Sequence, residues 1–219
     1  MYLIANIIVC VCALAGFIYG GIQFFRPRKA LYAQMITLSL GCIAFGRMFN
    51  IVRLLTGGNL TDYFQLGFLG LIGSLMFFFS ANFGTVDSLL DDGSKEFNKY
   101  RLIPLAAPGL AVVLYVALFL FSGVSPLWKI LGAVLTVFAM AASYFNLKHL
   151  IFPEVDFGIV QYLKPYNLLA LIYTASIFVE CVALSRSNEV LTLICCCVTG
   201  LVTAAIIPTV VRGFAKWKT

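Results

Sequence analysis

Charge is scarce in this chain of 219 residues, because only 11% of them are charged while 62% are hydrophobic. Soluble domains carry roughly 25% charged residues, so the composition argues against a fold solvated by water. Histidine is nearly absent as well, with one in the whole chain. That single histidine excludes an intramembrane zinc hydrolase, which needs several His or acidic ligands. We therefore expect no metal site and no cofactor.

Several catalytic and binding motifs are also missing. There is no G-x-S-x-G sequence, which argues against a serine hydrolase elbow, and no Walker loop, which argues against nucleotide hydrolysis by this chain. The last apolar run, Val190–Val211, has no lysine, so a retinal Schiff base of the rhodopsin type is excluded. No Pro-Gln pair occurs, unlike in the small sugar transporters with seven spans.

The seven cysteines do not form the pattern of a disulfide framework, because all of them lie inside apolar runs. Three are consecutive, Cys195 to Cys197, and neighbouring helical positions point about 100° apart. Such neighbours cannot converge on one soft metal ion, so packing is the better interpretation. The remaining four are Cys10, Cys12, Cys42 and Cys181.

Long apolar blocks are what the sequence does contain. A helix needs about 20 apolar residues to cross the hydrocarbon of a bilayer. We predict an all-α integral membrane protein with about seven transmembrane helices in one polytopic domain over residues 1–219. The first block has no basic segment before it, so we interpret it as a retained helix and not as a signal peptide. The expected spans are residues 2–25, 30–55, 63–86, 102–121, 128–147, 166–185 and 190–211.

Lysine and arginine are distributed unevenly between the two ends of these spans. Eleven lie on one side and three on the other, with Arg47 inside a span. Because basic residues favour the cytoplasmic side, we expect the N-terminus outside and the C-terminus in the cytoplasm. The basic residues also suit anionic membrane lipids as partners and do not indicate nucleic-acid binding. Short loops without a targeting signal favour the plasma membrane of a bacterium. The larger group comprises Arg26, Arg28, Lys29, Lys95, Lys99, Arg101, Lys148, Lys164, Arg212, Lys216 and Lys218, and the smaller one Arg53, Lys129 and Arg186.

Ionisable residues inside a membrane are unfavourable in free energy, so those that are present are candidates for a functional site. Three lie clearly within the expected spans, away from the first two positions: Arg47, Arg53 and Glu180. At 1.5 Å of rise per residue, Arg47 lies about 12 Å from the outer end of its helix and Glu180 about 9 Å from the outer end of its own. The similar depths predict an ion pair, since pairing spares both side chains an uncompensated charge in lipid.

Arg47, Asn50 and Arg53 recur at intervals of three residues, which spreads them over roughly 120° of the helix surface. We expect these three residues, with Glu180, to form a ligand-binding site in an outward-facing cavity. An arginine fork suits a carboxylate or phosphate, so the ligand would be a small anionic or polar solute. Two alternatives are open: Arg53 reaches the outer interface while Arg47 only neutralises Glu180, or the arginines contact lipid headgroups.

A second polar group lies on the expected cytoplasmic side and consists of Asn82, Asp87, Asp91 and Asp92. Oxygen ligands of this kind suit Mg²⁺ with a diphosphate. The group resembles the aspartate-rich motif of intramembrane prenyltransferases, although its spacing differs and no second aspartate-rich segment occurs. Lys95 and Lys99 follow closely, so a solvated loop of mixed charge is the main interpretation.

Two functions of different classes fit these patterns. The leading hypothesis is a small transporter, or the membrane subunit of one, in which Arg47 and Arg53 attract the solute and Glu180 releases Arg47 or carries a coupled proton. The alternative is a seven-helix sensor or receptor module that signals through a separate cytoplasmic protein docked on the loop 88–101. A lesser alternative is an intramembrane lipid-modifying transferase that uses Asp87, Asp91 and Asp92.

Overall fold

The computed structural model describes residues 2–25, 30–58, 60, 66–83, 95, 98–152 and 159–217. Within these ranges the chain is helical, and long helices are joined by short connections. The elements are α1 (Tyr2–Phe24), α2 (Leu31–Leu55), α3 (Leu66–Asn82), α5 (Asn98–Leu102), η3 (Ile103–Leu105), α6 (Ala106–Tyr115), η4 (Val116–Leu120), α7 (Pro126–Ile151), α8 (Ile159–Ser185) and α9 (Glu189–Trp217).

Six helical stretches of the described chain are long and apolar enough to cross a membrane. One of these stretches is a continuous helical rod over Asn98–Leu120, which consists of α5, η3, α6 and η4. The remaining helix, α3, is apolar but has 17 residues. The protein is therefore a multi-pass apolar helical bundle with six candidate spans among seven described helices. Six of the seven expected spans fall on these six stretches, although α7 and α9 continue past the apolar runs that predict them. The expected span 63–86 falls on α3 and on residues outside the described ranges.

The start of α8 differs from the sequence-based expectation. The sixth expected span begins at residue 166, just after Pro165, but α8 begins at Ile159 and contains this proline. A proline inside a helix removes one backbone hydrogen bond, to the carbonyl four residues earlier. Here that loss falls in the second turn of a 27-residue helix, and membrane helices tolerate such losses where neighbours or water satisfy the carbonyl.

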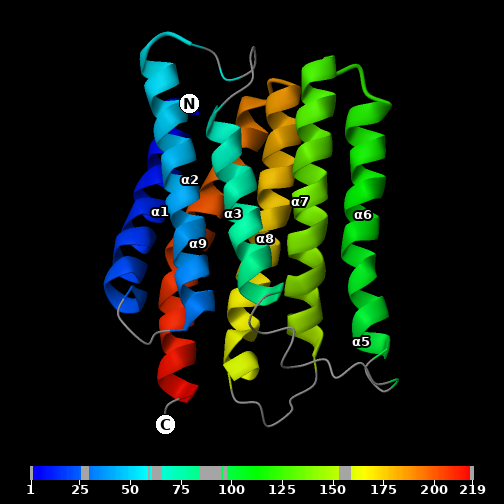
Figure 1. The fold of residues 1–219 in the computed structure, drawn as a ribbon. Coiled ribbons are helices and arrows are strands. Elements are labelled where there is room, and N and C mark those ends of the chain that lie inside the picture. Colours follow the sequence, from blue (N-terminus) through cyan, green and yellow to red (C-terminus); the bar gives the residue numbers. More distant parts are fainter. Residues whose placement is uncertain are drawn as a thin grey trace.

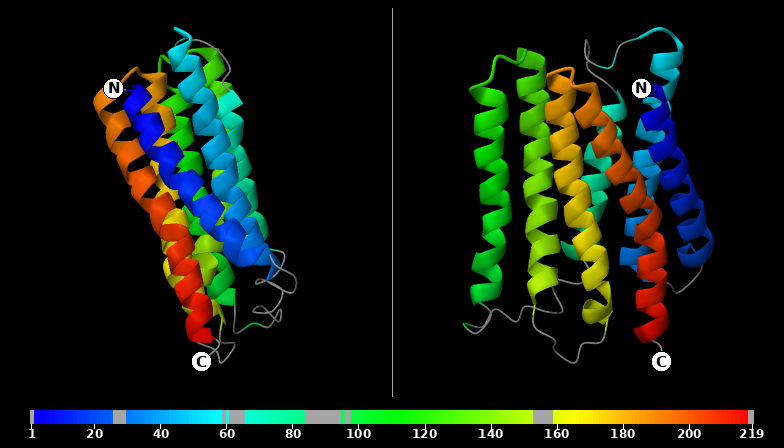
Figure 2. Two further views of the ribbon diagram at one scale, coloured as in Figure 1. Left: turned by 90° about the vertical axis from the view of Figure 1, so that its left-hand side faces the viewer. Right: turned by 180° about the vertical axis from the view of Figure 1, so that it is seen from behind.

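Six of the helices form a closed ring in the order α1, α2, α3, α7, α8 and α9, with α9 returning to α1. The rod containing α6 lies outside the ring and packs against α7 (Figures 1 and 2). The N- and C-termini lie at opposite ends of the bundle (Figure 2). In this arrangement α2 and α3 face α8 and α9 across the interior of the ring.

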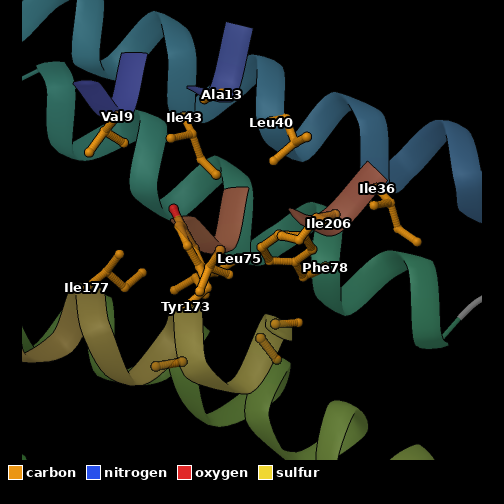
Figure 3. Close-up of a cluster of buried hydrophobic side chains, with 14 of the residues drawn as sticks. Val9, Ala13, Ile36, Leu40, Ile43, Leu75, Phe78, Tyr173, Ile177 and Ile206 are labelled. Carbon is orange, nitrogen blue, oxygen red and sulfur yellow. The ribbon is translucent and has the colours of Figure 1, made fainter. Parts of the chain in front are cut away.

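The interior of the ring is filled by apolar side chains (Figure 3), while many large apolar residues also point outward. Leu201 is 74% exposed and Phe45 is 65% exposed, for example. A surface apolar to this extent needs lipid and not water as its solvent. The central cluster contains Val9, Ala13, Ile36, Leu40, Ile43, Leu75, Phe78, Tyr173, Ile177 and Ile206.

Glycines bring α2 and α3 into close contact beside the expected site. A Cβ atom on Gly70 would lie 2.5 Å from the carbonyl oxygen of Cys42, and one on Gly46 would lie 2.7 Å from the carbonyl oxygen of Gly67. Both distances are too short for real atoms, so the two backbones touch only because these side chains are absent. A Cβ on Gly67 would collide with the amide oxygen of Asn50. The glycines thus make room for the polar residues of α2.

Candidate functional site

The predicted ion pair between Arg47 and Glu180 is present in the interior of the ring. Nη1 of Arg47 donates to Oε1 of Glu180 at 2.5 Å, and Nη2 donates to Oε2 at 2.6 Å. Both residues are 2% exposed. The paired forks of guanidinium and carboxylate give the strongest form of charge-assisted hydrogen bond. The pair therefore links α2 to α8, two helices on opposite sides of the ring.

Two further residues, which the sequence did not single out, complete the network around the pair. The amide oxygen of Asn6, on α1, accepts from Nη1 of Arg47 and from Nδ2 of Asn50, each at 3.2 Å. The thiol of Cys196, on α9, donates to Oε1 of Glu180 at 3.5 Å. Helices α1, α2, α8 and α9 thus each contribute at least one polar group to a network of Asn6, Arg47, Asn50, Glu180 and Cys196. We call it the outer polar network after the orientation expected from the sequence.

The run of three cysteines agrees with the packing interpretation in part. Cys195 and Cys196 are buried and Cys197 is exposed, so the three thiols do not point to one place. No group of three or more His, Cys, Asp or Glu side chains with metal-binding geometry occurs among the described residues. Cys196 nevertheless has a polar role beyond packing, because it contacts Glu180.

Two polar atoms of the outer network have no hydrogen-bond partner among the described residues: Nε of Arg47 and Oδ1 of Asn50. Arg47, Asn50 and Glu180 line a small cavity of about 20 Å³, whose other walls include Phe68 and Trp128. A cavity needs roughly 10–15 Å³ to hold one water molecule. A group of that size fits beside the pair, whereas a larger solute does not fit in this conformation.

Arg53 does not join this cavity. It is half-buried one and a half turns further along α2, and its side chain lies against Gly58 just after the helix ends. Arg47 is buried and Arg53 lies in the last turn of α2, so the two arginines do not share a solvent-filled pocket here. The ligand-binding role of Arg47, Asn50, Arg53 and Glu180 stays a prediction.

In the middle of the ring, a hydrogen bond joins polar side chains of α3 and α8. The hydroxyls of Ser74 and Tyr173 are 2.7 Å apart, and both residues are buried. Tyr173 packs edge-on against Phe78, with ring centroids 5.4 Å apart. Leu75 and Phe78 fill the space around this cross-link (Figure 3), so apolar groups separate the outer network from the other end of the ring.

A cluster of three asparagines joins α3, α7 and α8 towards the opposite end. Nδ2 of Asn82 donates to Oδ1 of Asn146 at 2.8 Å and to Oδ1 of Asn167 at 3.0 Å. Each of the three is at most 1% exposed. Asn82 belonged to the predicted cytoplasmic polar group, and Asn146 was expected at the same end, whereas Asn167 was not predicted to lie near them. Asp87, Asp91 and Asp92 lie outside the described residues, as does most of the loop 88–101.

Asn6, Asn146 and Asn167 share a signal that sequence analysis can detect. Each is an amide in an otherwise apolar helix, where an unpaired amide is costly and a partner is therefore expected.

Comparison of the chain with protein-family models, with curated proteins and with solved structures found no match.

Proposed function

We propose that the protein is a small membrane transporter, or the membrane subunit of one, whose outer gate is the Arg47–Glu180 pair. The observation that carries the proposal is this buried two-point ion pair, which spans the interior of a ring of helices. A buried ion pair adds little stability compared with apolar side chains of the same volume. Ionisable residues at such positions commonly mark the paths of solutes or protons.

The geometry suggests how such a gate works. Both terminal nitrogens of Arg47 are occupied by Glu180, so a solute anion competes with that carboxylate for the same fork. Either the solute carboxylate or phosphate replaces Glu180, or a proton on Glu180 weakens its hold and frees Arg47. Arg53, near the outer end of α2, attracts the anion on its way in.

Two helices that contribute to the outer polar network, α8 and α9, can also bend. Pro208 lies inside α9 and Pro165 inside α8, and a proline removes the hydrogen bond that keeps a helix straight at that point. Bending of these two helices would separate Glu180 from Arg47 without breaking the contacts of α1 with α2. This movement would open the outer half of the ring.

Uptake by the purified protein in liposomes tests the proposal. Candidate solutes are monocarboxylates, dicarboxylates and inorganic phosphate, and we expect one class to enter faster than into empty liposomes. E180D and R47K keep both charges but break the two-point geometry, so uptake should change at least several-fold. R186Q, which removes an exposed arginine at the end of α8, is the matched control and should transport normally. No uptake of any candidate would contradict the transporter hypothesis.

One observation favours the sensor alternative: the pair is sealed, and its cavity has room for about one water molecule. In a sensor, a solute would shift the balance between helix arrangements without crossing. Liposome uptake, together with the melting temperature measured with and without each anion, separates the two functions. An anion would support a sensor if it raises the melting temperature of the unmodified protein but not of E180D or R47K, and never enters the liposomes.

A further inference from the structure

A cleft opens between the first turns of α8 and the last turns of α9, at the end of the bundle where the C-terminus lies (Figure 2). Its volume is about 550 Å³, far larger than the cavity beside Arg47. Its lining includes Tyr162, Pro165, Thr209, Arg212 and Lys216. This cleft takes no part in the outer polar network, and the proposed transport function does not use it.

The charged side chains among the described residues that line the cleft are both basic. Arg212 and Lys216 are four residues apart on α9, so they lie on one face of the helix. Both are exposed, and no acidic residue is among the described residues that line the cleft. An arginine fork binds phosphate oxygens at two points, lysine adds a second positive charge, and the Thr209 hydroxyl adds a donor. The cleft is thus suited to a phosphate group.

The position of Arg212 along α9 places it at the depth of lipid phosphates. It is the first charged residue after an uncharged run of 22 residues, Val190–Val211. That run is about 33 Å long at 1.5 Å per residue, close to the hydrocarbon thickness of roughly 30 Å. Tyr162 lies at the same level on α8, and tyrosine is enriched at the interface between hydrocarbon and headgroups.

The two helices that form the cleft are held together at its base. A Cβ atom on Gly213 would lie 2.7 Å from the backbone oxygen of Tyr162, so the backbones of α8 and α9 touch at this glycine. The backbone positions of Arg212 and Lys216, on either side of Gly213, are thus set close to the α8 wall. The cleft is built by the helix packing and not by side chains alone.

We propose that this cleft binds the phosphate headgroup of an anionic membrane lipid, with Arg212 and Lys216 holding the phosphate. Basic pockets between transmembrane helices on the cytoplasmic side are typical sites for such headgroups, and this end carries the excess of basic residues. A lipid suits the site better than a free anion because the cleft lies at the edge of the hydrocarbon. The pyrrolidine ring of Pro165 and the Tyr162 ring offer apolar surface to the glycerol and upper acyl region.

The test uses the full-length protein purified in detergent, with phosphatidylglycerol or phosphatidylcholine added at equal amounts. Lipid binding is measured by native mass spectrometry and by the rise in melting temperature. We expect phosphatidylglycerol to bind more tightly. In R212Q/K216Q its apparent affinity should fall roughly 25-fold, whereas in K129Q/R186Q, which removes equal charge at the other end, it should be unchanged. R212K keeps the charge but loses the fork, so we expect a loss of a few-fold.

Three results would overturn the proposal. The first is equal binding of the two lipids, and the second is full retention of phosphatidylglycerol by R212Q/K216Q. The third comes from an arm with inorganic phosphate alone. If phosphate binds as tightly as the lipid and depends on Arg212 and Lys216, the cleft is a site for a soluble anion. Size-exclusion profiles check that each variant is folded, which we expect because Arg186, Arg212 and Lys216 are exposed and Lys129 is half-buried.

Discussion

The Arg47–Glu180 pair is a single contact between two residues that affects the stability of the whole bundle. Moving two charges out of water costs several kcal/mol for each ion, and their attraction repays this only with good geometry. The two hydrogen bonds of 2.5 and 2.6 Å provide that geometry, and Asn6 and Cys196 add further partners. Removing one charge therefore differs greatly in its consequences from removing both.

We predict that E180L destabilises the protein by about 3–5 kcal/mol, because it leaves the Arg47 charge buried without its partner. The double variant R47M/E180L replaces both charges with apolar side chains and should recover most of that loss. R186Q, at an exposed position, should change stability by less than about 0.5 kcal/mol. Thermal unfolding in detergent measures all three. If E180L and R186Q behave alike, the pair is not buried in the folded protein.

At the scale of helix pairs, the contact between α2 and α3 depends on the absence of side chains. Backbone atoms, which cannot rotate away, face Gly70 from Cys42 and from Gly46. We predict that G70A forces the helices apart and destabilises the protein by roughly 1–3 kcal/mol. The control is G109A in α6, where an added Cβ has nothing within 4 Å, so it should be neutral or slightly stabilising. Melting temperatures in detergent compare them, and equal values would show that α2 and α3 do not touch in the folded protein.

The helices were predictable because each long apolar run needs the whole length of a span. The ends of the helices were harder to predict, since a helix does not stop where hydropathy falls. Helix α9 continues beyond Val211 to Trp217, and α8 starts before Pro165. The pairing of Arg47 with Glu180 followed from depth alone. Asn6 and Cys196 could not be assigned in the same way, because depth does not tell which helices are neighbours or how each is rotated.

The whole molecule has its termini at opposite ends (Figure 2), which requires an odd number of crossings if all the long helices span the membrane. Six described helices meet the length for a span, so the parity depends on α3. Its 17 residues extend about 25 Å, somewhat less than the hydrocarbon thickness of roughly 30 Å. Its place inside the ring, between α2 and α7, argues that it crosses with them, since a short helix is accommodated by local thinning of the bilayer.

Reporter fusions test this topology directly. Alkaline phosphatase is active only outside the cytoplasm, so a fusion after Gly57, beyond α2, should be active and one after Lys95, beyond α3, inactive. Green fluorescent protein fused after Thr219 should fluoresce, because the basic residues predict a cytoplasmic C-terminus. Activity at both Gly57 and Lys95 would mean that α3 does not cross. Activity at Lys95 with none at Gly57 would mean that the bundle is inverted, which would put Arg47 and Glu180 in the cytoplasmic half and make the gate an inner one.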